Sequence, residues 1–183
     1  MKLKGTNVLL GVSGSIAAYR ACDFITLLRN EGASVRVIMT KDAQHFITPL
    51  SLQSFSGNEV MTDFFSLPGR TKPVHIELAR WANVVCVAPA SADVLARFAN
   101  GLADDLLTCT VLATEAKLVV APAMNEKMYF HPATQENLAR LKKRGVSVVD
   151  PIKGHLVCIE EGIGHLAENA SILTAVSKAC TKK

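Results

Sequence analysis

Hydrophobic positions along this chain fall into two patterns: continuous runs, and segments in which an apolar residue recurs every three or four positions. Continuous runs bounded by glycine or polar residues are typical of strands that are buried on both faces. Five runs have this character, namely TNVLLGV (6–12), ASVRVIMT (33–40), NVVCVAPA (83–90), KLVVAPA (117–123) and VSVVD (146–150). The chain is therefore predicted to contain a sheet of buried strands.

Segments with helical spacing lie between and after these runs. One begins at Pro132 and ends at Gly145, residues that favour the start and the end of a helix. The helical segments are 15–32, 48–57, 75–82, 91–114 in two pieces broken near Gly101, 132–145 and 170–180. This alternation predicts one α/β domain over residues 1–183, a three-layer, Rossmann-like or flavodoxin-like parallel sheet with helices on both faces.

Charge and composition narrow the class of function. The formal net charge is +4, and the basic residues are scattered apart from LKKRG and the terminal TKK, so we expect no nucleic-acid interface. No apolar stretch is long enough to span a membrane, so we expect no membrane association. The five cysteines include no C-x-x-C pair, which favours a reducing cytoplasm over a zinc site or a disulfide framework. We expect a cytoplasmic protein that binds a small molecule and no metal.

The loop after the first strand, GVSGSIAA (11–18), has the composition of an anion site. Gly14 allows a tight turn, Ser13 and Ser15 add hydroxyl groups, and the next helix offers unpaired N–H groups. The loop matches neither the P-loop nor G-x-G-x-x-G. The second strand ends at the neutral Thr40, where an NAD site carries an acidic residue. A ligand with one phosphate and no adenosine ribose, such as FMN, fits this pattern better, and an ordinary strand–helix turn explains the loop equally well.

Two further groups of candidates open helical segments. Small residues follow the third strand and let a flat ring system approach the backbone; they are Pro89, Ala90, Ser91 and Ala92. Alternatively, Ser91 simply caps the next helix. His75 opens the segment 75–82, where it is either a general base or a structural residue.

The segment APAMNEKMYFHP (121–132) leaves the fourth strand with an amide flanked by methionines. Met124 and Met128 are four residues apart, so they share one face of a helix and by default pack in the core. Asn125 either binds a carboxylate through its NH₂ group or caps the next helix.

The segment GHLVCIEEGIGHLAE (154–168) places Cys158 among closely spaced glycines. Glycines around a cysteine indicate a mobile flap that carries a thiol. The alternative is a loop in which Cys158 is a small buried apolar residue.

In this order along the chain, the motifs resemble the homo-oligomeric flavin-containing cysteine decarboxylases. The matching stretches are GVSGSIAAYR, HIELARWA, APASADVLARFANGLADDLLT, PAMNEKMY and LVCIEEGIGHLAE, which together reach along nearly the whole chain. PAMNEKMY matches the family signature P-x-M-N-x-x-M-W/Y. Two positions depart from the family pattern, since Ile159 follows Cys158 where glycine is usual and Tyr129 replaces the more common tryptophan.

The resemblance implies a role for each candidate residue. His75 matches the proposed catalytic base, Asn125 the residue that binds the substrate carboxylate, and Cys158 the proton donor. Cys158 would be carried on a glycine-rich substrate flap over about 152–168. Met124 and Met128 would add substrate contacts. FMN would be held by Gly14, Ser15, Thr40, Phe46, Pro89, Ala90, Ser91 and Ala92.

The best-matching branch of the family implies FMN-dependent decarboxylation of 4′-phosphopantothenoylcysteine to 4′-phosphopantetheine in coenzyme A biosynthesis. Oxidation of the thiol carbon to a thioaldehyde would let the C=S group accept the electrons when CO₂ departs. Reduction of the resulting ene-thiolate would then close the cycle. The resemblance also implies a homo-oligomer, either a trimer or four trimers in a dodecamer, with flavin between subunits.

Three related activities are alternatives. Oxidative decarboxylation of the C-terminal cysteine of a peptide needs no proton-donating thiol, so Cys158 argues against it. A flavin prenyltransferase fits PAMN and Cys158 less well. A non-catalytic flavin-binding regulatory subunit would keep His75 but would carry an extended acidic tail, which this sequence lacks.

Overall fold

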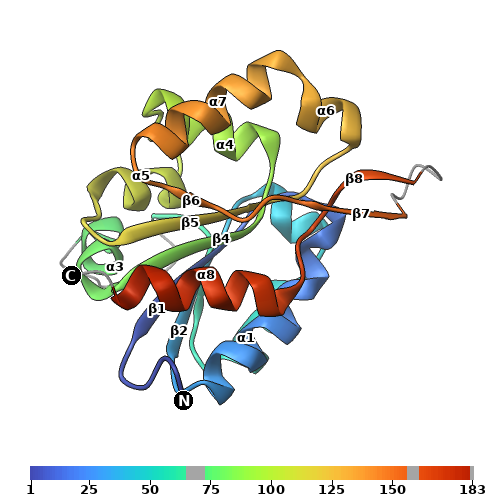
Figure 1. The fold of residues 1–183 in the computed structure, drawn as a ribbon. Coiled ribbons are helices and arrows are strands. Elements are labelled where there is room, and N and C mark those ends of the chain that lie inside the picture. Colours follow the sequence, from blue (N-terminus) through green and yellow to red (C-terminus); the bar gives the residue numbers. More distant parts are fainter. Residues whose placement is uncertain (65–72, 156–160, 182–183) are drawn as a thin grey trace.

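The computed structural model describes residues 1–64, 73–155 and 161–181. A parallel sheet with the strand order β3-β2-β1-β4-β5-β6 forms its centre (Figure 1). The strands are β1 (Asn7–Val12), β2 (Ser34–Met39), β3 (Val60–Met61), β4 (Val84–Ala90), β5 (Lys117–Pro122) and β6 (Ser147–Val148). This is the strand order of a Rossmann sheet, in which the direction of winding reverses between β1 and β4. The predicted α/β parallel sheet is therefore confirmed.

Helices cover both faces of the sheet, which explains why its strands are continuously apolar. One face packs against α1 (Ala21–Asn30), α2 (Pro49–Ser56) and α8 (Asn169–Thr181). The other packs against α3 (Val74–Trp81), α4 (Ala92–Asn100), α5 (Leu106–Ala113) and α7 (Pro132–Lys143). Neighbouring residues of β1 point to opposite layers, because Leu10 lies in the same core as Phe24 of α1, whereas Leu9 lies with Leu95 of α4. The three-layer prediction is confirmed.

Several elements differ from the predicted ones in extent. The segment 15–32 begins as a 3-10 helix, η1 (Ile16–Arg20), before it continues as α1. The segment 91–114 divides into α4 and α5 as expected, and Gly101 ends α4 with φ 70°. The second 3-10 helix η2 (Asp42–His45) and the two-residue strand β3 were not predicted, and the short helix α6 (Glu126–Phe130) was indicated only by the spacing of Met124 and Met128. Elements this short carry no periodic pattern of their own.

The glycine-rich segment predicted as a flap over about 152–168 contains two antiparallel strands. Strands β7 (Ile152–His155) and β8 (Glu161–His165) pair with each other and extend beyond the body of the molecule (Figure 1). Glycine is depleted in strands, so this pairing is not predictable from the residue types. Cys158 and Ile159 lie outside the described residues.

None of the helices in the described parts of the chain has the length and apolar character needed to cross a membrane.

Candidate functional site

A buried serine joins the tips of β1 and β4 at the point where the sheet reverses its winding. Ser13 Oγ donates a hydrogen bond to the carbonyl oxygen of Pro89 at 2.8 Å and accepts one from the backbone nitrogen of Ser91 at 2.8 Å. The Ser13 side chain is fully buried. Its hydroxyl, expected among the ligand donors, is therefore committed to holding the two strand tips together. Ligands of such sheets bind just beyond this reversal point.

A cavity of about 680 Å³, called the main cavity below, lies beyond these tips. Its volume is in the range of small-molecule and cofactor sites. The loops after β1, β4 and β5 contribute to it, together with Phe46 and the end of β8. The lining residues are Gly14, Ser15, Ile16, Ala17, Tyr19, Arg20, Phe46, Ser91, Ala92, Ala123, Met124, Asn125, Met128, Gly164, His165 and Leu166.

Most of the candidate residues named from the sequence lie together in this cavity. They are Gly14, Ser15, Phe46, Ser91, Ala92, Met124, Asn125 and Met128. Pro89 and Ala90 belong to the buried β4 and are absent from the lining, although the Pro89 carbonyl positions Ser13. Four separate stretches of sequence therefore converge on one space.

The loop after β1 approaches its neighbour so closely that a side chain is excluded. A Cβ atom at Gly14 would lie 2.7 Å from Cβ of Asp42 in η2, which is closer than real Cβ contacts come. Ser15 accepts a hydrogen bond from the backbone nitrogen of Ala17 at 3.2 Å and so caps η1. The absence of a side chain at Gly14 leaves backbone rather than bulk on this wall of the cavity.

The amide of Asn125 is the N-cap of α6. Its Oδ1 accepts a hydrogen bond from the backbone nitrogen of Lys127 at 2.9 Å. The capping alternative is thus observed, and the same side chain also lines the main cavity. Met128 is 49% exposed on this wall, so its expected packing in the core is wrong. Met124 is half-buried and packs against the core.

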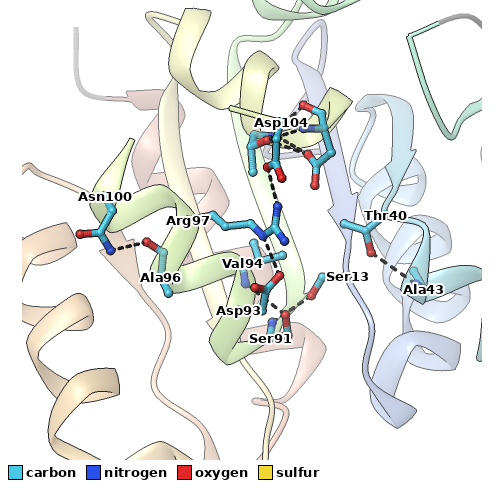
Figure 2. A network of polar contacts seen from close by, with 12 residues as sticks. Ser13, Thr40, Ala43, Ser91, Asp93, Val94, Ala96, Arg97, Asn100 and Asp104 are labelled. Carbon is cyan, nitrogen blue, oxygen red and sulfur yellow. Dashed lines mark hydrogen bonds and ion pairs between the residues drawn. The ribbon is translucent and has the colours of Figure 1, made fainter. Parts of the chain in front are cut away.

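A smaller cavity of about 360 Å³, the second cavity, lies on the other side of Gly14 and Ser91. Thr40 lines this cavity rather than the main one, and its hydroxyl accepts a hydrogen bond from the backbone nitrogen of Ala43 (Figure 2). Five aspartates and two basic residues line the space, which are Asp42, Asp63, Asp93, Asp104, Asp105, Lys41 and Arg97. A phosphate is better accommodated in the main cavity, because this excess of carboxylates repels it.

Arg97 holds two of these carboxylates in place. Its guanidinium extends between Asp93 and Asp104 and bonds both (Figure 2). The hydrogen bond from Arg97 lowers the pKa of the Asp104 carboxyl below its ordinary value. The network orders the loop between α4 and α5 at the rim of the second cavity.

His75 is not among the described residues that line either cavity, although it contacts Phe64, which lines the second. It sits in the first turn of α3, whose N-cap is Pro73, and its ring meets that of Phe64 edge-on with centroids 5.6 Å apart. Its Nδ1 is buried and finds no hydrogen-bond partner within the described ranges of the chain. Buried polar atoms are normally paired. Asn125 lines the main cavity and His75 does not, so the described part of one chain does not bring the two side chains into a common cavity.

Tyr129, which stands where the family more often has tryptophan, uses its hydroxyl. The hydroxyl donates to Asp150 Oδ1 at 3.1 Å, and Gln135 donates to the Tyr129 carbonyl. Burial, followed by the charge of Asp150, raises the pKa of Tyr129 to about 12. The side chain links α6 to the start of the hairpin region and does not line either cavity.

Two residues at this site were not predicted from the sequence. Arg20 lines the main cavity and bonds the Leu166 carbonyl, and Glu126 bonds the backbone of β8. Both contacts join residues far apart in the sequence, so no local pattern marks them.

Comparison with known proteins gives the site a context. The family model described as Flavoprotein matches residues 1–181. The coenzyme A biosynthesis bifunctional protein CoaBC of Haemophilus influenzae is 43% identical over 183 residues, which is 100% of this chain and 46% of that protein. The chain thus spans about half the length of this curated relative.

Two solved structures are similar over nearly their whole length. One is a PPC decarboxylase variant complexed with pantothenoylaminoethenethiol, with a TM-score of 0.83 and 37% identity, covering 93% of this chain and 96% of that one. The other is the FMN-dependent cysteine decarboxylase SpaF, with a TM-score of 0.83 and 33% identity, covering 94% of this chain and 98% of that one.

Proposed function

The chain belongs to the Flavoprotein family, and on that premise we propose that it is an FMN-dependent decarboxylase of 4′-phosphopantothenoylcysteine in coenzyme A biosynthesis. One observation carries the proposal: the loops after β1, β4 and β5 bring Gly14, Ser91 and Asn125 into one cavity of about 680 Å³. The similarity of the chain to a PPC decarboxylase complexed with pantothenoylaminoethenethiol supports the choice of substrate.

The main cavity fits FMN in shape and chemistry. Gly14, Ser91 and Ala92 present little side-chain bulk, and the exposed surfaces of Phe46 and Met128 offer apolar contact for a flat ring system. The second cavity suits the flavin phosphate less well because of its five aspartates. When bound, FMN would supply the two-electron oxidation of the thiol carbon and the later return of hydride.

The protein's own residues would orient the substrate and move its protons. The NH₂ group of Asn125 can donate a hydrogen bond to a carboxylate. The bond that Asn125 Oδ1 accepts from the Lys127 backbone at the start of α6 holds the side chain in position. Met124 and Met128 would contact the substrate beside it. Cys158, outside the described residues, would donate the proton of the reductive step, and His75 would take the thiol proton.

The position of His75 extends the proposal to a homo-oligomer. Among the residues that the structure describes, His75 and Asn125 do not line a common cavity of one chain. A site that contains both residues needs a second copy, so His75 of the partner subunit would complete the main cavity. The trimer or dodecamer expected from the resemblance, and a cytoplasmic location, belong to this proposal.

A substrate comparison tests the proposed function against its nearest alternative. The purified protein with FMN is offered 4′-phosphopantothenoylcysteine and, separately, a peptide that ends in cysteine, and CO₂ release is measured. We expect release from the pantothenoyl substrate. Release from the peptide alone would overturn the assignment in favour of a peptide decarboxylase, and release from neither would favour a flavin-binding subunit.

A further inference from the structure

Strand β8 is fastened to the segment that leaves β5 by two hydrogen bonds. The backbone nitrogen of Met124 donates to the Gly164 carbonyl at 3.0 Å. Two residues further on, Glu126 Oε1 accepts from the backbone nitrogen of Ile163 at 2.8 Å. A side-chain carboxylate thus stands where a neighbouring strand would offer its carbonyl.

The absence of side chains at Gly162 and Gly164 of β8 permits this close approach. A Cβ atom at Gly164 would lie 2.0 Å from the Met124 carbonyl oxygen, and one at Gly162 would lie 3.0 Å from Oε2 of Glu126. Gly164 also has φ 158°. β8 therefore lies flush on the 124–126 segment, and its exit, Gly164 to Leu166, forms one wall of the main cavity beside Asn125.

The far end of this wall has its own attachment. Arg20 Nη1 donates to the Leu166 carbonyl at 2.7 Å, and its Nη2 bonds Glu168 at 3.0 Å. Arg20 therefore holds the wall at Leu166, and the Glu126 carboxylate holds it at Ile163, three residues earlier. Glu126 itself does not line the cavity, so it acts on the site only through β8.

We infer that Glu126 is a positioning residue: its carboxylate fixes β8 at Ile163 and thereby sets the distance between the Gly164–Leu166 wall and Asn125. The inference rests on the proposed function for its catalytic consequence. The contact runs from the side chain of one element to the backbone of another, so the position of β8 depends on where α6 holds this acceptor oxygen. Misplacing a substrate-binding wall by about 1 Å costs up to roughly a hundredfold in turnover.

Two substitutions separate positioning from helix stability. Glu126→Ala removes the acceptor but keeps a strong helix former in α6. Glu126→Gln removes the charge and keeps a carbonyl oxygen that can accept from Ile163. Glu136→Ala is the matched control, because Glu136 is an exposed carboxylate of α7 that pairs with Arg140 on the surface.

Hydrogen–deuterium exchange and steady-state turnover are measured on the FMN-loaded full chain of each variant, with thermal unfolding as the check on folding. We expect Glu126→Ala to speed exchange in peptides that cover 161–166 and to lower kcat/KM by about tenfold or more. We expect Glu126→Gln to keep the exchange rate and kcat/KM within about twofold of the unsubstituted protein. We expect Glu136→Ala to change neither quantity.

Unchanged exchange in Glu126→Ala would overturn the attachment itself, whatever the activity. Faster exchange with unchanged turnover would overturn the positioning role. Loss of turnover in Glu126→Gln at normal exchange would overturn it as well, since the charge would then matter beyond placement. If the unsubstituted protein releases no CO₂, the proposed function fails, and the exchange data and the FMN affinity of the variants decide the role of Glu126 on their own.

Discussion

The hydroxyl of Ser13 lies 2.8 Å from the carbonyl oxygen of Pro89, a residue 76 positions away in the sequence. Through this bond, and through the one that it accepts from Ser91, a single buried side chain holds together the tips of β1 and β4. The loops that leave those tips carry Gly14, Ser15 and Ala92 into the main cavity. The geometry of the proposed flavin site therefore depends on a residue that does not line it.

Ser13→Ala is predicted to lower both stability and flavin affinity. It removes the acceptor for the Ser91 backbone nitrogen and one donor to Pro89, and an unsatisfied buried polar group costs about 1–3 kcal/mol. Thermal unfolding and an FMN fluorescence titration measure the two effects. Ser54→Ala is the control, because Ser54 bonds the Leu50 carbonyl of its own helix on an exposed face. Equal stability and equal FMN affinity of the two variants would show that the Ser13 hydroxyl does not hold the flavin site in place.

Gly14→Ala is predicted to abolish or strongly weaken FMN binding. The added methyl group would meet Cβ of Asp42 at 2.7 Å, so either η2 or the loop after β1 has to move. The double variant Gly14→Ala with Asp42→Gly removes the opposing Cβ atom. Flavin titration of both should show weaker binding in the single variant and partial recovery in the double one. Equal loss in both would mean that the clash is not the cause.

Asn125→Asp is predicted to keep flavin and lose the substrate. Aspartate also caps helices well, so α6 and the fold should persist. The new negative charge would stand against the substrate carboxylate and repel it. The flavin absorbance of the purified variant and its rate of CO₂ release report the two parts separately. Full activity in this variant would exclude Asn125 from carboxylate binding.

Co-expression of His75→Asn and Asn125→Asp chains tests whether copies share a site. Each chain alone should be inactive under the proposed function. If His75 of the partner subunit completes the main cavity, a random one-to-one mixture leaves about a quarter of the sites with both residues intact, and about a quarter of the activity returns. If a verified mixed oligomer stays inactive, His75 and Asn125 of the same chain, rather than of two chains, must act in one site.

Tyr129 predicts a pH dependence of stability. Burial raises its pKa from 10.0 to about 12, so the folded protein favours the protonated phenol more than the unfolded chain does. The corresponding stabilisation is fully present below pH 10 and is lost as the pH rises from about 10 to about 12. The free energy of unfolding should fall over this window, and fall less in Tyr129→Phe. Parallel curves for the two proteins would show that Tyr129 does not titrate in this way.

Much of the sheet was predictable because its strands are buried on both faces. TNVLLGV and NVVCVAPA are continuous apolar runs, and the structure has β1 and β4 within them. Placing the site at the strand tips also succeeded, because parallel strands end at one edge of a sheet and their loops must converge there. Eight of the candidate residues line the main cavity for this reason.

Contacts between distant segments were not predictable from local pattern. The hydroxyl of Ser13 looked like a ligand donor, and only the fold reveals its bond to Pro89. The glycines of 154–164 predicted a flap but gave no indication that β7 and β8 pair or that β8 lies against Glu126. His75 matched a catalytic position, yet the packing of α3 places it outside both cavities of its own chain.

The proposed decarboxylase is tested by the mass of the product formed from 4′-phosphopantothenoylcysteine after incubation with the purified protein and FMN. We expect the loss of CO₂ alone, because oxidation and reduction cancel within one catalytic cycle. Loss of CO₂ together with two hydrogens would contradict the reductive step and the assignment of Cys158 as its proton donor. A substrate of unchanged mass would contradict the decarboxylase itself.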